Sequence, residues 1–151
     1  MRIGILTFHY AHNYGAMLQA YALRKVLLAL GQDVKFVNYK LPYIKNRYIL
    51  FPPYIYIKLS RLNRMKFFIK VMLTLHEKLT KAHRFKTFQK SFLPEYTTNL
   101  SNTDLIIVGS DQVWNPAITN GYNDAYWGYL YHGIPHIMYA VSCQSKYITK
   151  E

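Results

Sequence analysis

Two short polar segments carry the residue types from which a binding site could be built. The first is HNYGA, residues 12–16, which lies between an apolar run and an amphipathic stretch. Asn13 could cap the following helix or hydrogen-bond a ligand, Tyr14 could pack or bind, and Gly15 lets the backbone approach closely. The free N–H groups at a helix start also favour an anion. The segment lacks the G-x-G-x-x-G and P-loop patterns, so no glycine-cradled phosphate is expected.

Two histidines in this region raise the question of a metal. His9 and His12 are three residues apart. As a pair they lack evident third and fourth ligands in the sequence. We therefore predict no metal site and no cofactor.

The second polar segment is GSDQVWNP, residues 109–116, directly after an apolar run. Its polar and aromatic side chains are Ser110, Asp111, Gln112, Trp114 and Asn115. Such a set suits a sugar, because an aromatic ring packs on an apolar sugar face while carboxylate and amide groups bind hydroxyls. The structural alternative is a turn in which Asp111 accepts backbone N–H groups and Trp114 fills the core. We favour the core role for Trp114 and a functional role for Asp111.

Hydrophobic periodicity predicts the elements that hold these segments. Apolar runs predict strands near residues 2–8, 33–38, 104–109 and 136–141. Spacings of three and four predict helices over residues 15–30, capped by Gly31, and over residues 62–91. The first strand, helix and strand form a right-handed unit of a parallel sheet. We therefore predict an α/β fold with a Rossmann-like, doubly wound parallel sheet in three layers.

The predicted sheet also locates the site. We expect the first strand to lie between the second and the third, with the fourth beyond the third. Ligands of such sheets bind beyond the carboxyl ends of the strands, where both polar segments lie. Because neighbouring strands are about 5 Å apart, Asn13 and Asp111 should face one cleft within roughly 10–12 Å of each other.

The positive charge is concentrated in one part of the chain. The net charge is +12, and residues 41–100 hold twelve Lys and Arg against two acids. We expect a basic helical insertion at about residues 41–95 within a single Rossmann-like domain spanning residues 1–151. Cys143 is the sole cysteine, which excludes an internal disulfide and fits a reducing cytoplasm.

The two motifs together carry a resemblance to a known family. GILTFHYAHNYGAMLQAYAL followed by IIVGSDQVWNP resembles the amino-terminal part of the polysaccharide pyruvyl transferases, from Met1 to about Tyr139. YAVSCQSK departs from the family's usual sequence at that point, so Cys143 is not a candidate nucleophile. The resemblance implies a GT-B-like amino-terminal domain, one of two Rossmann-like halves that face each other across a cleft.

The resemblance also implies an activity. The family transfers a pyruvyl group from phosphoenolpyruvate to a sugar of a cell-surface polysaccharide. It implies acceptor binding by His12, Asn13, Tyr14, Gly15, Ser110, Gln112, Trp114 and Asn115, with Asp111 orienting or deprotonating the acceptor hydroxyl. The acceptor would be a sugar or a lipid-linked glycan.

The donor site is expected outside this sequence. The catalytic histidine and the arginines that hold phosphoenolpyruvate belong to the family's carboxyl-terminal domain, which is absent, so we expect a truncated member. The two polar loops agree, since residues 9–19 and 109–131 contain no Lys or Arg. Phosphoenolpyruvate would bind only with a second domain, and this chain by itself is expected to be inactive.

Two alternatives to the transferase remain. The charge and the tyrosines suit a nucleic-acid-binding module, which we do not favour because Lys and Arg ordinarily form the solvated face of a helix. Peripheral binding to the inner face of a membrane by residues 48–75 is the other, and it is compatible with a transferase that acts on lipid-linked glycans.

Overall fold

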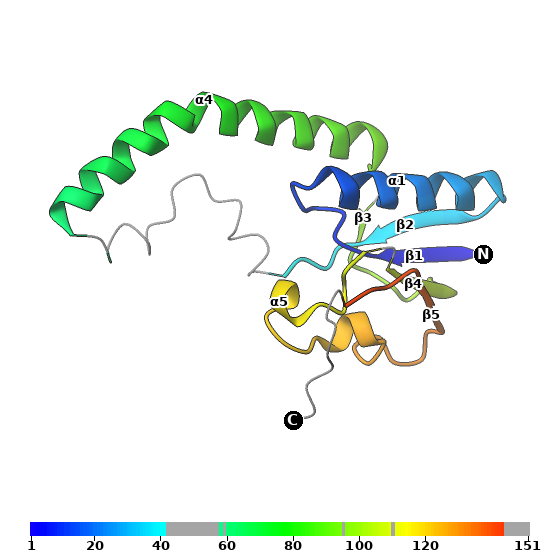
Figure 1. The fold of residues 1–151 in the computed structure, drawn as a ribbon. Helices are drawn as coiled ribbons and strands as arrows, with labels where there is room; N and C mark the ends of the chain where they lie inside the picture. Colours follow the sequence, from blue (N-terminus) through cyan, green and yellow to red (C-terminus); the bar gives the residue numbers. More distant parts are fainter. Residues whose placement is uncertain (42–57, 59, 95, 110, 144–151) are drawn as a thin grey trace.

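The computed structural model describes residues 1–41, 58, 60–94, 96–109 and 111–143 (Figure 1). The amino-terminal elements are β1 (Arg2–Leu6), α1 (Tyr14–Ala29) and β2 (Asp33–Val37). The remaining elements are the long helix α4 (Arg61–Phe92), β3 (Tyr96–Thr97), β4 (Leu105–Gly109), α5 (Pro116–Thr119), the 3-10 helix η1 (Asp124–Trp127) and β5 (His136–Tyr139). The four predicted strands and both predicted helices are therefore confirmed.

All five strands form one parallel sheet in the order β3-β2-β1-β4-β5. The predicted arrangement of the four longer strands is confirmed, and with it the α/β class. Strand β3 was not predicted, because two residues are too few to show a periodicity. Its register against β2, with Thr97 opposite Val37, is set by tertiary contact at the sheet edge.

Alternate residues of β1 separate the two faces of the sheet. Ile5 packs with Phe36 and with α1 on one face, whereas Leu6 packs with Val108 and Tyr126 on the other. Figure 1 shows α1 and α4 on the first side and α5 with η1 on the second. The sheet is thus covered on both faces, as predicted, although short helices rather than a long one cover the second face.

Helix α1 ends as its sequence predicts. Gly31 adopts a φ of 74°, in the left-handed region that favours glycine. Its N–H donates to the carbonyl of Leu28, and the N–H of Gln32 donates to the carbonyl of Leu27. These two bonds satisfy carbonyls at the helix end and form a Schellman motif.

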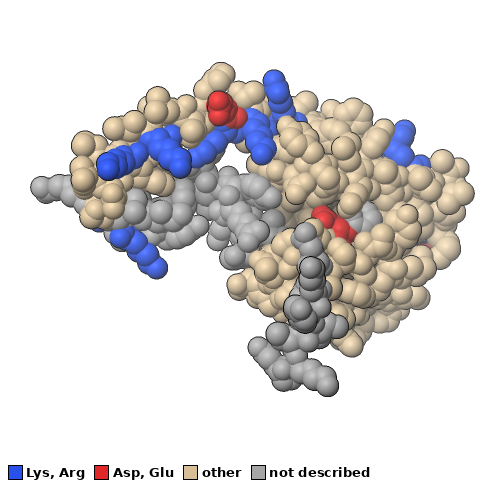
Figure 2. Space-filling model, in the orientation of Figure 1, with Lys and Arg blue, Asp and Glu red and all other residues tan. Residues whose placement is uncertain are grey.

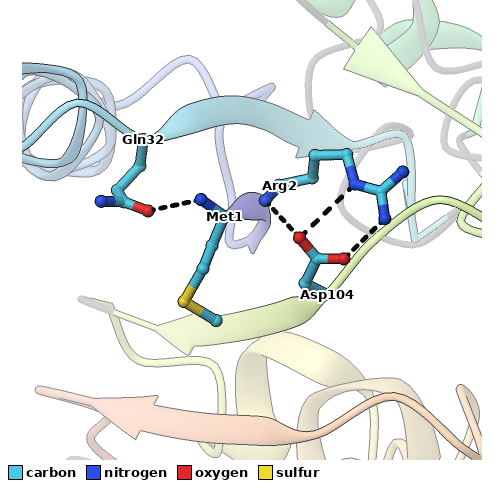
Figure 3. Close-up of polar contacts among 4 residues, drawn as sticks. All are labelled: Met1, Arg2, Gln32 and Asp104. Atoms are coloured by element: carbon cyan, nitrogen blue, oxygen red, sulfur yellow. Dashed lines mark hydrogen bonds and ion pairs between the residues drawn. The ribbon is translucent and has the colours of Figure 1, made fainter.

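The amino ends of the strands are joined at the opposite edge from the predicted site (Figure 3). The Arg2 guanidinium pairs with Asp104 at 2.7 Å, and the backbone N–H of Arg2 donates to the same carboxylate. The hydrogen bonds from Arg2 lower the pKa of Asp104 to about 2. The amino terminus donates to Gln32 at 2.9 Å, so β1 is tied to both of its neighbours at this edge.

Candidate functional site

The sheet brings the two polar segments to one edge. Strands β1 and β4 are parallel neighbours, with Leu6 opposite Val108 near their carboxyl ends. The segments that follow them therefore leave the sheet at the same edge. The separation of Asn13 from Asp111 stays a prediction.

Asn13 caps helix α1. Its Oδ1 accepts the N–H groups of Gly15 at 2.8 Å and Ala16 at 3.4 Å. These bonds satisfy two donors that a helix start leaves unpaired. Asn13, Tyr14 and Gly15 are all exposed. They therefore remain accessible to a ligand, even though the side-chain oxygen of Asn13 is used by the cap.

His9 is a core residue. Its side chain is fully buried, with the ring 5.3 Å from that of Phe36 and 5.0 Å from that of Tyr96. Nδ1 lies 3.1 Å from the carbonyl oxygen of Thr7, which can only accept, so Nδ1 carries the proton. Burial, and next the charge of Lys40, lower the pKa of His9 to about 4.

Helix α4 packs against the first loop, a contact that the sequence did not predict. The Phe85 ring stacks on the His12 ring, with their centroids 5.2 Å apart, and its centroid lies 4.6 Å from that of the Tyr14 ring. Burial, and next the charge of Lys81, lower the pKa of His12. His12, a predicted acceptor-binding residue, is thus part of an aromatic contact between this loop and α4.

The same helix places cations beside the first loop. A hollow of about 280 Å³ lies between α1 and α4, and its lining residues are Tyr14, His76, Glu77, Thr80, Lys81 and Arg84. The loops themselves contain no Lys or Arg, and these cations of α4 are distant from both loops in the sequence. The crossing of α4 over the start of α1 brings the two together.

The second loop is tied to the chain that follows β5. The carbonyl of Asp111 accepts the N–H of Ser142 at 3.1 Å, and the N–H of Trp114 donates to the carbonyl of Ser142 at 3.3 Å. Asp111 Oδ1 accepts the N–H of Gln112 at 2.7 Å. Burial raises the pKa of Asp111, against the smaller opposing effect of that bond. A half-buried carboxylate with a raised pKa is suited to proton transfer.

The amides of this loop hold its shape. Asn115 Nδ2 donates to Gln112 Oε1 at 3.1 Å, and Asn115 Oδ1 accepts the N–H of Ala117 at 3.0 Å as the cap of α5. Asn115 therefore uses both ends of its amide within the loop. Ser110, also predicted to bind the acceptor, lies outside the described residues.

Trp114 packs against the core, as favoured from the sequence. Its Nε1 donates to the carbonyl of Tyr126 at 2.9 Å. Its ring stacks on that of Trp127, with the ring centroids 4.5 Å apart and an angle of 12° between the ring planes. Tyr122 continues the stack, 5.4 Å from Trp127. Tyr122 and Trp127 expose ring surface, as does Tyr129 beside Tyr122, so this region has accessible aromatic rings. The aromatic density of YNDAYWGY, residues 122–129, was the signal for them in the sequence.

A cluster of tyrosines lies under this edge. Tyr10 Oη accepts the N–H of Leu41 at 2.8 Å, and Tyr39 Oη is hydrogen-bonded to Asn123. Tyr126 is fully buried between them, which raises its pKa well above the ordinary value. Phenol groups thus join the segments that follow β1, β2 and β4.

The described residues contain no group of three His, Cys, Asp or Glu side chains arranged to hold a metal ion. Cys143 is partly buried near the end of the described chain. None of the helices in the described ranges has both the length and the apolarity of a bilayer-spanning segment.

A sequence model of the family described as polysaccharide pyruvyl transferase matches residues 13–148. The chain belongs to this family. The match includes every predicted site residue except His12, which precedes it by one position. It continues past Tyr139, where the resemblance was expected to fade, through the segment that contains Cys143. Comparison with curated proteins and with solved structures finds no match.

Proposed function

We propose that this polysaccharide pyruvyl transferase domain binds the glycan acceptor at the carboxyl edge of β1 and β4. The observation that carries the proposal is Asp111, a half-buried carboxylate with a raised pKa at the edge where such sheets bind ligands. The exposed rings of Tyr122 and Trp127 lie in the same part of the fold and offer surfaces on which a pyranose can stack. Family membership supplies the substrate class.

The role of Asp111 is that of a base. As the oxygen of a sugar hydroxyl forms a bond to the pyruvyl carbon, the bond from that carbon to the phosphate oxygen breaks and phosphate leaves. The hydroxyl has to lose its proton in this transfer, and Asp111 would accept that proton. A raised pKa makes the carboxylate a stronger base than an exposed aspartate. Oδ1 accepts the N–H of Gln112 at 2.7 Å, which restrains the orientation of the carboxylate.

Phosphoenolpyruvate would be the donor, bound across the cleft of a GT-B-like enzyme. Its phosphate and carboxylate require converging cations. Lys81 and Arg84 are the cations that the structure brings to the first loop, whereas the loops have none. We propose that full donor binding requires cations beyond these two. The lone cysteine supports a cytoplasmic location, where thiols stay reduced.

The test of acceptor binding is a matched pair of substitutions. Asp111→Asn keeps the size of the side chain but removes the base, and Asp33→Asn makes the same change at the amino edge of the sheet. Binding of β-galactosides and N-acetylmannosamine glycosides would be measured by saturation-transfer NMR. The wild type and Asp33→Asn should show the same sugar signals, and Asp111→Asn should weaken them. Equal signals in all three proteins would place the acceptor elsewhere.

A second measurement addresses the donor. The purified chain is incubated with phosphoenolpyruvate and the same glycosides, and phosphate release is compared with a heat-killed control. We expect no turnover, because positioning of both substrates supplies much of the rate of a transfer. Turnover would show that these 151 residues hold the donor site as well.

A further inference from the structure

Helix α4 carries apolar side chains that nothing in the described structure covers. Six of them lie in its amino-terminal half, within Leu62–Leu73, which extends past the sheet (Figure 1). Each is about half exposed or more: Leu62, Met65, Phe68, Ile69, Met72 and Leu73. Leu73 is 78% exposed, whereas Val71 in the same stretch is only 7% exposed. The exposure is therefore confined to one side of the helix.

The exposed side of α4 is not the side that packs on the sheet. At about 100° per residue, the six side chains fall within an arc of roughly 140° that runs from Phe68 to Leu73. Phe85, which is buried, and Phe88, which packs beside it, project about 170° and about 130° away from the centre of that arc. The carboxyl-terminal half of α4 thus binds the domain through one face. The amino-terminal half presents a different apolar face to the outside.

Cations border the exposed arc on both sides. At the same spacing, Lys66 lies about 20° beyond Leu73, and Arg64 lies about 40° beyond Phe68. Lys70 follows next to Lys66, and Figure 2 shows Lys and Arg running along α4. The helix holds nine Lys and Arg and a single acid, Glu77.

We propose that the segment Leu62–Leu73 of α4, the α4 arm, binds the surface of an anionic lipid bilayer. An apolar arc bordered by cations matches the interface of such a bilayer. The aliphatic groups enter the acyl boundary, while Lys and Arg keep their charges at the headgroups. This inference does not depend on the proposed catalytic role.

Charge decides between a bilayer and the other partners. Packing of this face on a second copy would bring Arg64, Lys66 and Lys70 toward the same cations of that copy, with like charges opposed. A nucleic acid would stack on aromatic rings, but five of the six exposed side chains are aliphatic or Met. Anionic lipid neutralises the cations and accepts the aliphatic groups, so it satisfies both features.

Vesicle sedimentation of the whole chain tests the proposal. Binding to vesicles of phosphatidylcholine alone is compared with binding to vesicles that contain one-third phosphatidylglycerol. Lys66→Gln/Lys70→Gln should weaken binding to the anionic vesicles about 25-fold, since each cation at such a surface contributes about fivefold. Lys25→Gln/Lys35→Gln removes the same charge from exposed positions of α1 and β2 and should change it by less than about twofold.

A second pair tests the apolar arc. Ile69→Gln/Leu73→Gln keeps good helix formers and should weaken binding about tenfold or more. Leu18→Gln/Leu30→Gln makes the same kind of exchange at two exposed positions, one in α1 and one at its carboxyl-terminal cap, and should leave binding unchanged. Circular dichroism confirms that each variant retains its helices.

Three outcomes would overturn the proposal. The first is equal binding to neutral and anionic vesicles. The second is an equal effect of the α4 pairs and their controls. The third is the absence of vesicle binding together with evidence for another partner. That evidence would be a dimer, seen by light scattering, that Ile69→Gln/Leu73→Gln disrupts, or salt-sensitive binding of single-stranded RNA that requires Lys66 and Lys70.

Discussion

The buried imidazole of His9 should make the fold sensitive to acid. The ring is neutral in the folded protein, since Nδ1–H donates to Thr7 and burial lowers the pKa to about 4. Nε2 is buried without a hydrogen-bond partner among the described residues, so a second proton there would remain unpaired. In the unfolded chain the ring titrates at its ordinary value of 6.5.

The sign and size follow from linkage between protonation and folding. A histidine with a lowered pKa contributes stability that is fully present above the unfolded pKa and is lost as the pH falls from 6.5 toward 4. The complete effect is about 3 kcal/mol, and most of it is lost by pH ~4.5. Asp104, whose pKa is about 2, titrates below this window.

The variant His9→Phe keeps an aromatic ring among Phe36 and Tyr96 and removes the titrating group. Urea unfolding is followed by tryptophan fluorescence near pH 7.5 and pH 4.5. The wild type should lose about 2–3 kcal/mol more than the variant between the two pH values. His132→Phe, at an exposed position, is the control and should follow the wild type. An equal loss in the wild type and in His9→Phe would refute the assignment of a buried, neutral imidazole.

Two further predictions concern stability measured by urea unfolding. Gly31→Ala should lower the free energy of unfolding by about 1 kcal/mol, because only its φ of 74° opposes a side chain. Gly109→Ala should lower it by about 3 kcal/mol or more, because a Cβ there would also lie 2.5 Å from the carbonyl oxygen of Tyr139. Equal losses would show that the close approach of β4 to β5 is not constraining. Tyr10→Phe should cost about 1–3 kcal/mol by leaving the buried N–H of Leu41 without its acceptor, and an unchanged midpoint would mean that this bond contributes nothing.

The regular elements were predictable because their signals are local. Apolar runs marked β1, β2, β4 and β5, and spacings of three and four marked α1 and α4. The parallel order followed from the chirality of the first strand, helix and strand. The predicted first strand was two residues too long, since Phe8 leaves the sheet and packs against Tyr126 instead.

For the proposed site, the sequence predicted the end of the sheet at which both polar segments lie. Two polar segments that follow neighbouring parallel strands must leave the sheet at one edge, and the structure confirms that they do. The roles of individual side chains depend on partners that are distant in sequence. Asn115 is occupied by Gln112 and α5, and His12 stacks on Phe85, which is 73 positions further along the chain.

The sequence by itself determined the class of fold, the sheet order and the family, because periodicity, connection length and short motifs are properties of contiguous residues. Tertiary structure alone decided which groups meet. It buried His9, raised the pKa of Asp111 by desolvation, and laid the cations of α4 beside the start of α1. Desolvation and charge proximity depend on the path of the whole chain in space, so no local pattern of residues contains them.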